Sequence, residues 1–235
     1  MKKITFISDT HNYHKLLTND LPGGDILIHT GDISSMGYLH EINNFCKWFN
    51  ELDNYKYKIF IAGNHDWFFH DNWKAFTEFG ANRHKGAPRQ TADKISELLS
   101  SYENIIYLQD NYVIVDDIKI YGSPWQPWFH DWAFNLPKNG EEIKSKWDAI
   151  PSDTDILLTH GPAFGVLDDI YNSRGVHLGC ELLIDRIKEI KPKIHCCGHI
   201  HSGNGYHFDG DTHFINASSL NEDYDYFYKP FSIEI

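Results

Sequence analysis

The chain has 235 residues, 41% of them hydrophobic and 15% aromatic, with a formal net charge of -12 at pH 7. This composition can fill one large core and no linker-like stretch divides it, so we predict a single domain over residues 1–235. Clustered Lys and Arg bind phosphate backbones, so the acidic balance argues against a long nucleic acid as partner. Apolar runs are too short for a membrane span or a signal peptide, so we expect a cytoplasmic protein without a membrane partner.

The first quarter of the chain alternates strands with a helix. Residues 3–8 and 25–30 are short apolar runs typical of buried strands. Apolar side chains at helical spacing predict an amphipathic helix over residues 38–52, and a further strand is expected over residues 57–62. Strand, helix and strand in this order indicate a layered α/β fold.

The rest of the chain is expected to hold shorter strands and two helices. The apolar stripe of Ile95, Leu98 and Leu99 predicts the first of these helices. The other elements are expected in this order: strands over 105–108, 112–115, 118–121 and 155–159, a helix over 179–190, and strands over 193–197, 206–208, 212–216 and 231–235. We expect the three strands of the middle to pair antiparallel. Asp209-Gly210 predicts a hairpin turn, and the last strand is expected to close a sheet edge.

Polar segments follow the predicted strands at five places. They are Ser8-Asp9-Thr10-His11, Gly31-Asp32, Gly63-Asn64-His65-Asp66, His160-Gly161-Pro162 and Gly198-His199-Ile200-His201. Residues two apart on a strand share a face, so Asp9 with His11, and His199 with His201, can each aim two donors at one point. Turn chemistry alone also places Asp, Asn and Gly at strand ends. It does not account for seven metal-binding residue types in this order: Asp9, His11, Asp32, Asn64, His160, His199 and His201.

The order of these segments resembles the calcineurin-like metallophosphoesterase superfamily from Asp9 to His201. The resemblance implies an α/β fold, a four-layer α-β-β-α sandwich of two mixed β-sheets flanked by helices. It also implies a centre for two divalent metal ions that share Asp32. The implied ligands are Asp9, His11, Asp32 and His201 for the first metal, and Asp32, Asn64, His160 and His199 for the second.

The donor set combines carboxylates, imidazoles and one amide oxygen, which is of intermediate hardness. We favour Mn²⁺ on this ground, with Fe, Zn, Co or Mg as alternatives. Two such cations lower the pKa of a water between them and stabilise charge that develops on phosphate oxygens. The four cysteines lack metal-finger spacing and are expected as reduced thiols.

Two residues beside Asn64 are candidates for proton transfer. If Asn64 binds a metal, the adjacent His65 lies at the edge of the site, where a departing oxygen needs a proton. We therefore interpret His65 as the general acid. We expect Asp66 to accept a hydrogen bond from a ring nitrogen of His65, which is the role that the family resemblance gives to an acidic residue at this place.

An aromatic segment, residues 122–129, follows the strand over 118–121. Together with Thr159-His160-Gly161-Pro162 and Ile215-Asn216-Ala217-Ser218, it resembles the metallophosphoesterase-domain-containing subgroup, which is related to the class III cyclic nucleotide phosphodiesterases. This narrower resemblance implies hydrolysis of 2′,3′- or 3′,5′-cyclic nucleotides. Aromatic faces stack on bases, so Trp125, Trp128 and Phe129 are candidate substrate contacts. The alternative is that these three side chains pack the sheet edge.

Three functions stay open on the sequence. The leading one is metal-dependent hydrolysis of small phosphodiesters, with a small phosphorylated molecule, a nucleotide, as the partner. The nearest alternative is a phosphomonoesterase, including a protein phosphatase, although no insertion forms a recognisable peptide groove. A non-catalytic scaffold that keeps the fold is the other alternative, and the intact ligand set counts against it. A DNA nuclease is weaker still, because the chain has no basic stripe.

Overall fold

The first sheet consists mainly of parallel strands. The computed structural model describes residues 1–70, 92–170 and 175–235. Five strands lie in the order β13 (Phe231–Glu234), β1 (Lys3–Ile7), β2 (Gly24–Thr30), β3 (Tyr55–Ile61) and β4 (Ile105–Tyr107). Strands β1 to β4 run parallel to one another, and β13 runs antiparallel to β1 at the edge. The predicted edge strand at the end of the chain is therefore confirmed.

The second sheet has a parallel centre and antiparallel edges. Its order is β11 (Gly205–Phe208), β12 (His213–Asn216), β10 (Ile194–Cys197), β9 (Ile156–Thr159), β6 (Ile118–Ser123) and β5 (Asn111–Val115). Strands β12, β10, β9 and β6 are parallel, while β11 and β5 each form an antiparallel pair with a neighbour. The predicted hairpin between β11 and β12 is confirmed, and Gly210 adopts a positive φ of 105° in its turn.

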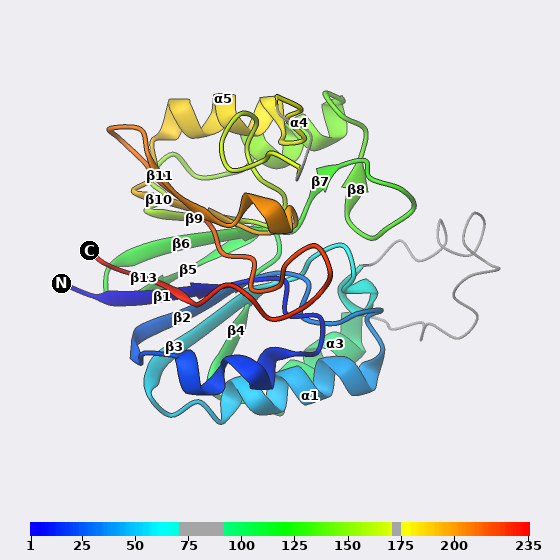
Figure 1. The fold of residues 1–235 in the computed structure, drawn as a ribbon, viewed down its shortest axis with the longest axis vertical. Coiled ribbons are helices and arrows are strands. Elements are labelled where there is room, and N and C mark those ends of the chain that lie inside the picture. The colour runs from blue at the N-terminus through cyan, green and yellow to red at the C-terminus, as the bar shows by residue number, and fades with distance from the viewer. Residues whose placement is uncertain (71–91, 171–174) are drawn as a thin grey trace.

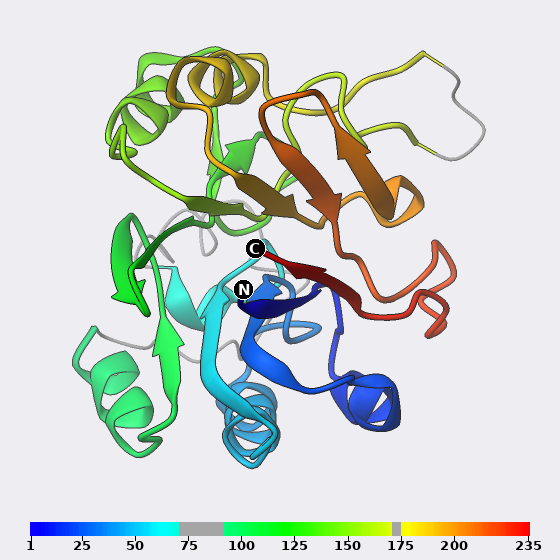
Figure 2. The same cartoon turned by 90° about the vertical axis from the view of Figure 1, so that its left-hand side faces the viewer.

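Helices cover the outer face of each sheet. The first sheet is covered by α1 (Leu39–Asn50), α3 (Ala92–Ser100) and the 3-10 helix η1 (His14–Asp20), and the second by α4 (Glu141–Asp148) and α5 (Glu181–Ile190). Figures 1 and 2 show the resulting order of helices, sheet, sheet and helices. The four-layer sandwich predicted from the sequence is therefore confirmed. In the described parts of the chain, no helix is both long and apolar enough to cross a membrane.

The core between the sheets is aliphatic. Ile28 and Ile59 of the first sheet face Ile120 and Leu158 of the second within one buried cluster. Alternation along each strand places the neighbouring side chains on the outer faces. There Phe60 packs under α1 and Leu157, Phe214 and Tyr121 pack under α4 and α5. Apolar burial on both faces therefore holds the strands in register and fixes where they end.

The middle of the chain differs from the prediction. Strand β4 pairs parallel with β3 in the first sheet, so the expected antiparallel arrangement is wrong for it and correct only for β5 and β6. The reason is that α3 precedes β4 and carries the chain back across the sheet, as a parallel connection requires. The sequence pattern also missed α4 and the short strands β7 (Gln126–Pro127) and β8 (Asn135–Leu136). Strands β7 and β8 are too short to show a period, and α4 buries only two apolar side chains, Ile143 and Trp147.

Candidate metal centre

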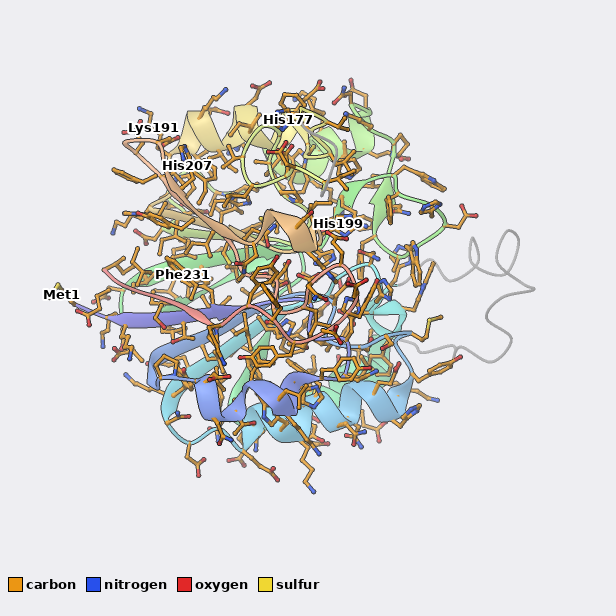
Figure 3. The ribbon with its side chains drawn as sticks, in the orientation of Figure 1. Met1, His177, Lys191, His199, His207 and Phe231 are labelled. Atoms are coloured by element: carbon orange, nitrogen blue, oxygen red, sulfur yellow. The ribbon has the colours of Figure 1, made fainter. Side chains whose placement is uncertain are left out.

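The predicted ligands lie where five parallel strands end. Strands β1, β2, β3, β9 and β10 are each followed directly by one or two of them: Asp9 and His11, Asp32, Asn64, His160, and His199 and His201. Figure 3 shows His199 well away from Met1, on the side where these strands end. Hydrogen bonds join the sheets here, since Nδ1 of His160 lies 2.9 Å from the carbonyl oxygen of Thr30.

One group of donors lies at the end of β1. Ligand atoms of Asp9, His11 and His201 all lie within 4.8 Å of one another. Nε2 of His201 is 3.6 Å from Oδ1 of Asp9, which is longer than a hydrogen bond. The backbone N–H of His199 donates to the Asp9 carboxylate at 3.0 Å, and Ser218 Oγ donates to it at 2.8 Å. These bonds fix the direction in which Asp9 points.

A second group of donors surrounds Asp32. Its Oδ2 lies 3.6 Å from Nε2 of His11 and 3.4 Å from Nε2 of His160. Nε2 of His160 is also 3.0 Å from Oδ1 of Asn64, and His199 completes a group with Asp32 and His160. The other oxygen of Asp32 accepts a hydrogen bond from a backbone N–H. A single carboxylate oxygen therefore faces both groups, as a shared ligand must.

The backbone at the strand ends is strained. The φ angles of four predicted ligands are positive: Asp9 at 49°, His11 at 39°, Asp32 at 53° and His199 at 68°. Residues with a side chain rarely adopt this region, and such strain concentrates at functional sites. Neighbouring glycines leave room for the ligands, because a Cβ on Gly198 would lie 2.1 Å from Oδ2 of Asp9.

The donor set fits divalent cations. Asp9 and Asp32 are almost fully buried, and neither ring nitrogen of His11 has a hydrogen-bond partner among the described residues. Burial acts to raise the pKa of both carboxyls, but the neighbouring His201 and His160 keep the two values below their ordinary range. Buried carboxylates and an imidazole without a partner are costly alone, and bound cations would offset that cost. All seven predicted ligands belong to this arrangement.

The imidazole of His65 lies at the edge of the centre. Its Nδ1 is 2.7 Å from the carbonyl oxygen of Ser35, so this nitrogen carries the hydrogen. The ring of Trp132 stacks on His65 with 4.0 Å between centroids, and His11 meets it edge-on at 4.6 Å. Packing on two sides and one hydrogen bond therefore hold the orientation of His65.

The expected hydrogen bond between Asp66 and His65 is wrong. The carboxylate of Asp66 accepts hydrogen bonds from the backbone N–H groups of Ile33, Ser34 and Gly63 and from the hydroxyl of Ser34. The backbone turns after His65, so Asp66 points into the protein while His65 points to the cavity. Burial, with the charge of Asp32, raises the pKa of Asp66 to about 6. Asp66 ties together the two loops that carry Asp32 and Asn64.

A cavity of about 280 Å³ opens beside the centre. The candidate ligands Asp32, Asn64, His199 and His201 form one wall together with His65, and apolar side chains form much of the rest: Phe129, Ile170, Leu178, Ile200 and Tyr224. Among the described residues that line it, none is Lys or Arg, and Glu222 adds a negative charge. The charged carboxylates among these described lining residues are therefore Asp32 and Glu222.

The aromatic segment divides between packing and the cavity. Trp125 packs against the cores of both sheets and donates its indole N–H to Asp110 at 2.8 Å, and it is not among the lining residues of the described cavities. Phe129 lines the cavity and meets the ring of His199 edge-on at 5.5 Å, and Trp128 is 57% exposed at a smaller adjoining cavity.

Several residues of the site were missed by the sequence reading. Tyr224 packs edge-on against His11 at 4.9 Å and against His201 at 5.2 Å, and Glu222 accepts the backbone N–H of Ser202. Both lie in a segment without strand or helix period, so no sequence signal marks them. Ser218, in contrast, belongs to a motif that the sequence singled out, and its contact with Asp9 gives that motif a role.

Proteins related in sequence match the part of the chain that carries the candidate ligands. The calcineurin-like phosphoesterase family matches residues 2–203. The chain is 38% identical over 231 residues to metallophosphoesterase domain-containing protein 1 of Homo sapiens, covering 97% of this chain and 69% of that protein. It is 38% identical over 226 residues to a UPF0046 protein of Caenorhabditis elegans, covering 92% of this chain and 55% of that protein.

Solved structures with little sequence identity share the fold. The phosphopantetheinyl hydrolase of Mycobacterium tuberculosis superimposes with a TM-score of 0.58 at 14% identity, over 92% of this chain and 88% of that one. The sequence match spans the strand ends and every candidate ligand from Asp9 to His201. On this combined evidence, the chain belongs to the calcineurin-like phosphoesterase family.

Proposed function

We propose that this chain hydrolyses small phosphodiesters and that cyclic nucleotides are its substrate class. The observation that supports this most directly is the charge of the cavity. A phosphodiester carries one negative charge, whereas a phosphomonoester carries about two near neutral pH. No Lys or Arg stands among the described lining residues, and Glu222 lies at the wall. A doubly charged monoester would therefore meet more repulsion than a diester.

The apolar walls support the same choice. Phe129 meets the ring of His199 edge-on at 5.5 Å, and Tyr224 meets the ring of His201 edge-on at 5.2 Å. A diester carries a carbon substituent on each side of its phosphorus, and apolar surface on two sides of the centre can bury both. A monoester uses only one such surface.

The proposed mechanism assigns a task to each side chain. Two divalent metals, when bound, supply a Lewis acid for the phosphate oxygens and activate water. Asp9, His11 and His201 would hold the first metal and Asn64, His160 and His199 the second, and Asp32 would contribute to both. The carbonyl of Ser35 accepts from Nδ1 of His65, so Nε2 faces the leaving oxygen, and the imidazolium form of His65 gives its Nε2 proton to that oxygen and becomes neutral. Asp66 positions the loops and has no contact with the proton.

The test of this function uses matched diester and monoester substrates. Demetallated protein is supplied with Mn, Fe, Zn or Mg, and its kcat/KM on bis-p-nitrophenyl phosphate is compared with that on p-nitrophenyl phosphate. We expect a clear diester preference with at least one metal, and hydrolysis of a 2′,3′- or 3′,5′-cyclic nucleotide by the same form. A large monoester preference would overturn the proposal in favour of a phosphomonoesterase. Failure of every metal would favour a non-catalytic scaffold.

The role of His65 has its own test. We expect His65→Ala to keep both metals and to lose about 10²–10⁴-fold in kcat on esters whose leaving groups need a proton. The loss on nitrophenyl esters should be much smaller, because nitrophenolate leaves without protonation. His40→Ala, at an exposed histidine, is the control. Metal analysis that finds one ion missing from His65→Ala would identify His65 as a ligand instead.

A further inference from the structure

A second, smaller cavity adjoins the metal centre. It has a volume of about 110 Å³ and shares Phe129, Leu178 and His199 with the larger cavity. The residues particular to it include Gln126 and Trp128. His65 lines only the larger cavity, so a group in the smaller one lies across His199 from the proton donor. This is the place for the arm of a substrate that stays on the phosphate.

Trp128 presents an exposed aromatic ring at this cavity. Its side chain is 57% exposed, although its backbone N–H donates to the carbonyl of Leu136 at 2.9 Å next to the β7–β8 pair. Asn135 holds the following loop, because its Nδ2 donates to the carbonyls of Phe129 and His130. A large exposed aromatic ring on an anchored backbone is suited to stacking on a planar ligand, since little conformational freedom is lost on binding.

Gln126 lines the same cavity and carries a buried acceptor without a hydrogen-bond partner among the described residues. It is only 1% exposed, and its Nε2 donates to Oδ1 of Asn135 at 3.2 Å. Asn135 donates from its Nδ2 to two backbone carbonyls, so the atom of Asn135 that faces Gln126 is its Oδ1. This oxygen requires a donor, which identifies the facing atom of Gln126 as Nε2 and the other amide atom as Oε1. Its Oε1 is buried and has no partner among the described residues. A buried carbonyl oxygen without a donor is costly, and a ligand N–H would satisfy it.

From these contacts we infer that the smaller cavity is a base subsite, in which Trp128 stacks on a planar ring and Oε1 of Gln126 accepts a hydrogen bond from an N–H group of that ring. The inference rests on the proposed function, because it places the phosphate at the metal centre. It adds the orientation of the substrate: the nucleoside stays in this subsite and the leaving oxygen lies toward His65. Lys138 also lines this cavity, and its Nζ lies 3.8 Å from Oε1 of Glu181, which partly neutralises its charge. Stacking on Trp128 and the acceptor of Gln126 are therefore the main contacts proposed for the base.

The first test compares two esters with the same leaving group. Thymidine 5′-(p-nitrophenyl phosphate) carries a base on the retained arm, and methyl p-nitrophenyl phosphate does not. We expect Trp128→Ala to lower the ratio of kcat/KM for the thymidine ester over the methyl ester by about tenfold, the effect of losing one base stack. Phe227→Ala, at an aromatic residue that is 66% exposed outside both cavities, should keep the wild-type ratio. An unchanged ratio in Trp128→Ala would overturn the inference.

The second test examines the acceptor. The wild type should prefer the thymidine ester over its N3-methyl analogue, which has no N–H on the ring. Gln126→Met keeps the length of the side chain but removes both the Oε1 acceptor and the Nε2 donor to Asn135, so this preference should fall about three- to tenfold. A general packing defect would lower both rates alike and leave the preference in place. A wild type that does not distinguish the two esters would overturn the role of Gln126.

The two proposals fail in different ways. If the wild type cleaves the methyl ester and shows no effect of the base, the proposed function stands and the subsite is wrong. If neither ester is cleaved, the proposed function is wrong, and binding of thymidine 5′-monophosphate decides the subsite. Weaker binding to Trp128→Ala than to the wild type would support the subsite, whereas equal binding, or none to either, would overturn it.

Discussion

The inter-sheet core and the strand ends are equally buried but differ in chemistry. Between the sheets, Ile28, Ile120 and Leu158 are fully buried among aliphatic neighbours on regular strands. At the strand ends, Asp9 and Asp32 are buried in positive-φ conformations among polar neighbours. Apolar burial stabilises the fold, whereas buried charge and backbone strain cost stability. Burial therefore stabilises the fold between the sheets and costs stability at the strand ends. Substitutions between the sheets should mainly lower the free energy of unfolding, whereas substitutions at the strand ends should mainly lower activity.

The largest effect is expected at the shared carboxylate. Asp32→Asn should lower diesterase activity on the order of 10³-fold or more, because one carboxylate oxygen faces both groups of donors. Metal content measured by elemental analysis should fall below two ions per chain.

A control for this change is Asp53→Asn, at an exposed aspartate far from any ligand in the sequence. It should leave both activity and metal content at wild-type values. Undiminished hydrolysis of diesters by Asp32→Asn would contradict the metal centre as described.

The next effect in size is expected in the inter-sheet core. Leu158→Ala should lower the free energy of unfolding by about 2–5 kcal/mol, because it leaves a cavity among aliphatic side chains. The metal content and kcat of the folded fraction should stay near wild type, since Leu158 lies within the strand and not at its end. Urea unfolding measures the first quantity. Leu16→Ala, at a leucine that is 54% exposed, should change stability by less than about 0.5 kcal/mol.

The smallest effect concerns a buried histidine outside the centre. His14 packs against Phe45 and Trp48, and its ring nitrogens have no hydrogen-bond partner among the described residues. Burial lowers the pKa of His14 from 6.5 to about 4. Between these values the unfolded chain binds a proton that the folded chain does not, so stability falls as the pH falls, by up to about 1.4 kcal/mol per unit.

His14→Phe should remove this contribution. The slope of the unfolding free energy against pH between about 6.5 and 4 should become shallower. The decrease should be up to about 1.4 kcal/mol per pH unit, which corresponds to one proton. Unfolding is measured in chelator, so that metal loss does not add to the slope. His40→Phe, at an exposed position, should keep the wild-type slope. An equal slope in the wild type and in His14→Phe would show that His14 is not buried in its neutral form.

The sequence by itself determined the order of strands and ligands. Each ligand follows a short apolar run, and both the run and the polar residue after it are local features that can be read without knowing the fold. The resemblance to a family then named seven of these polar residues, from Asp9 to His201, as candidate ligands, and the structure brings them together. The pairing of β4 was not predicted, because the direction of a strand depends on where the preceding helix packs.

Only the tertiary structure decided which side chains surround the ligands. Adjacent residues such as His65 and Asp66 point in different directions, so the partner of His65 is Ser35 and that of Asp66 is the loop after β2. Tyr224 reaches the centre from a segment without period, and Trp125 turns inward while Trp128 stays exposed. Such contacts join residues far apart in the chain, and the direction of each side chain depends on local backbone angles that composition and spacing do not encode.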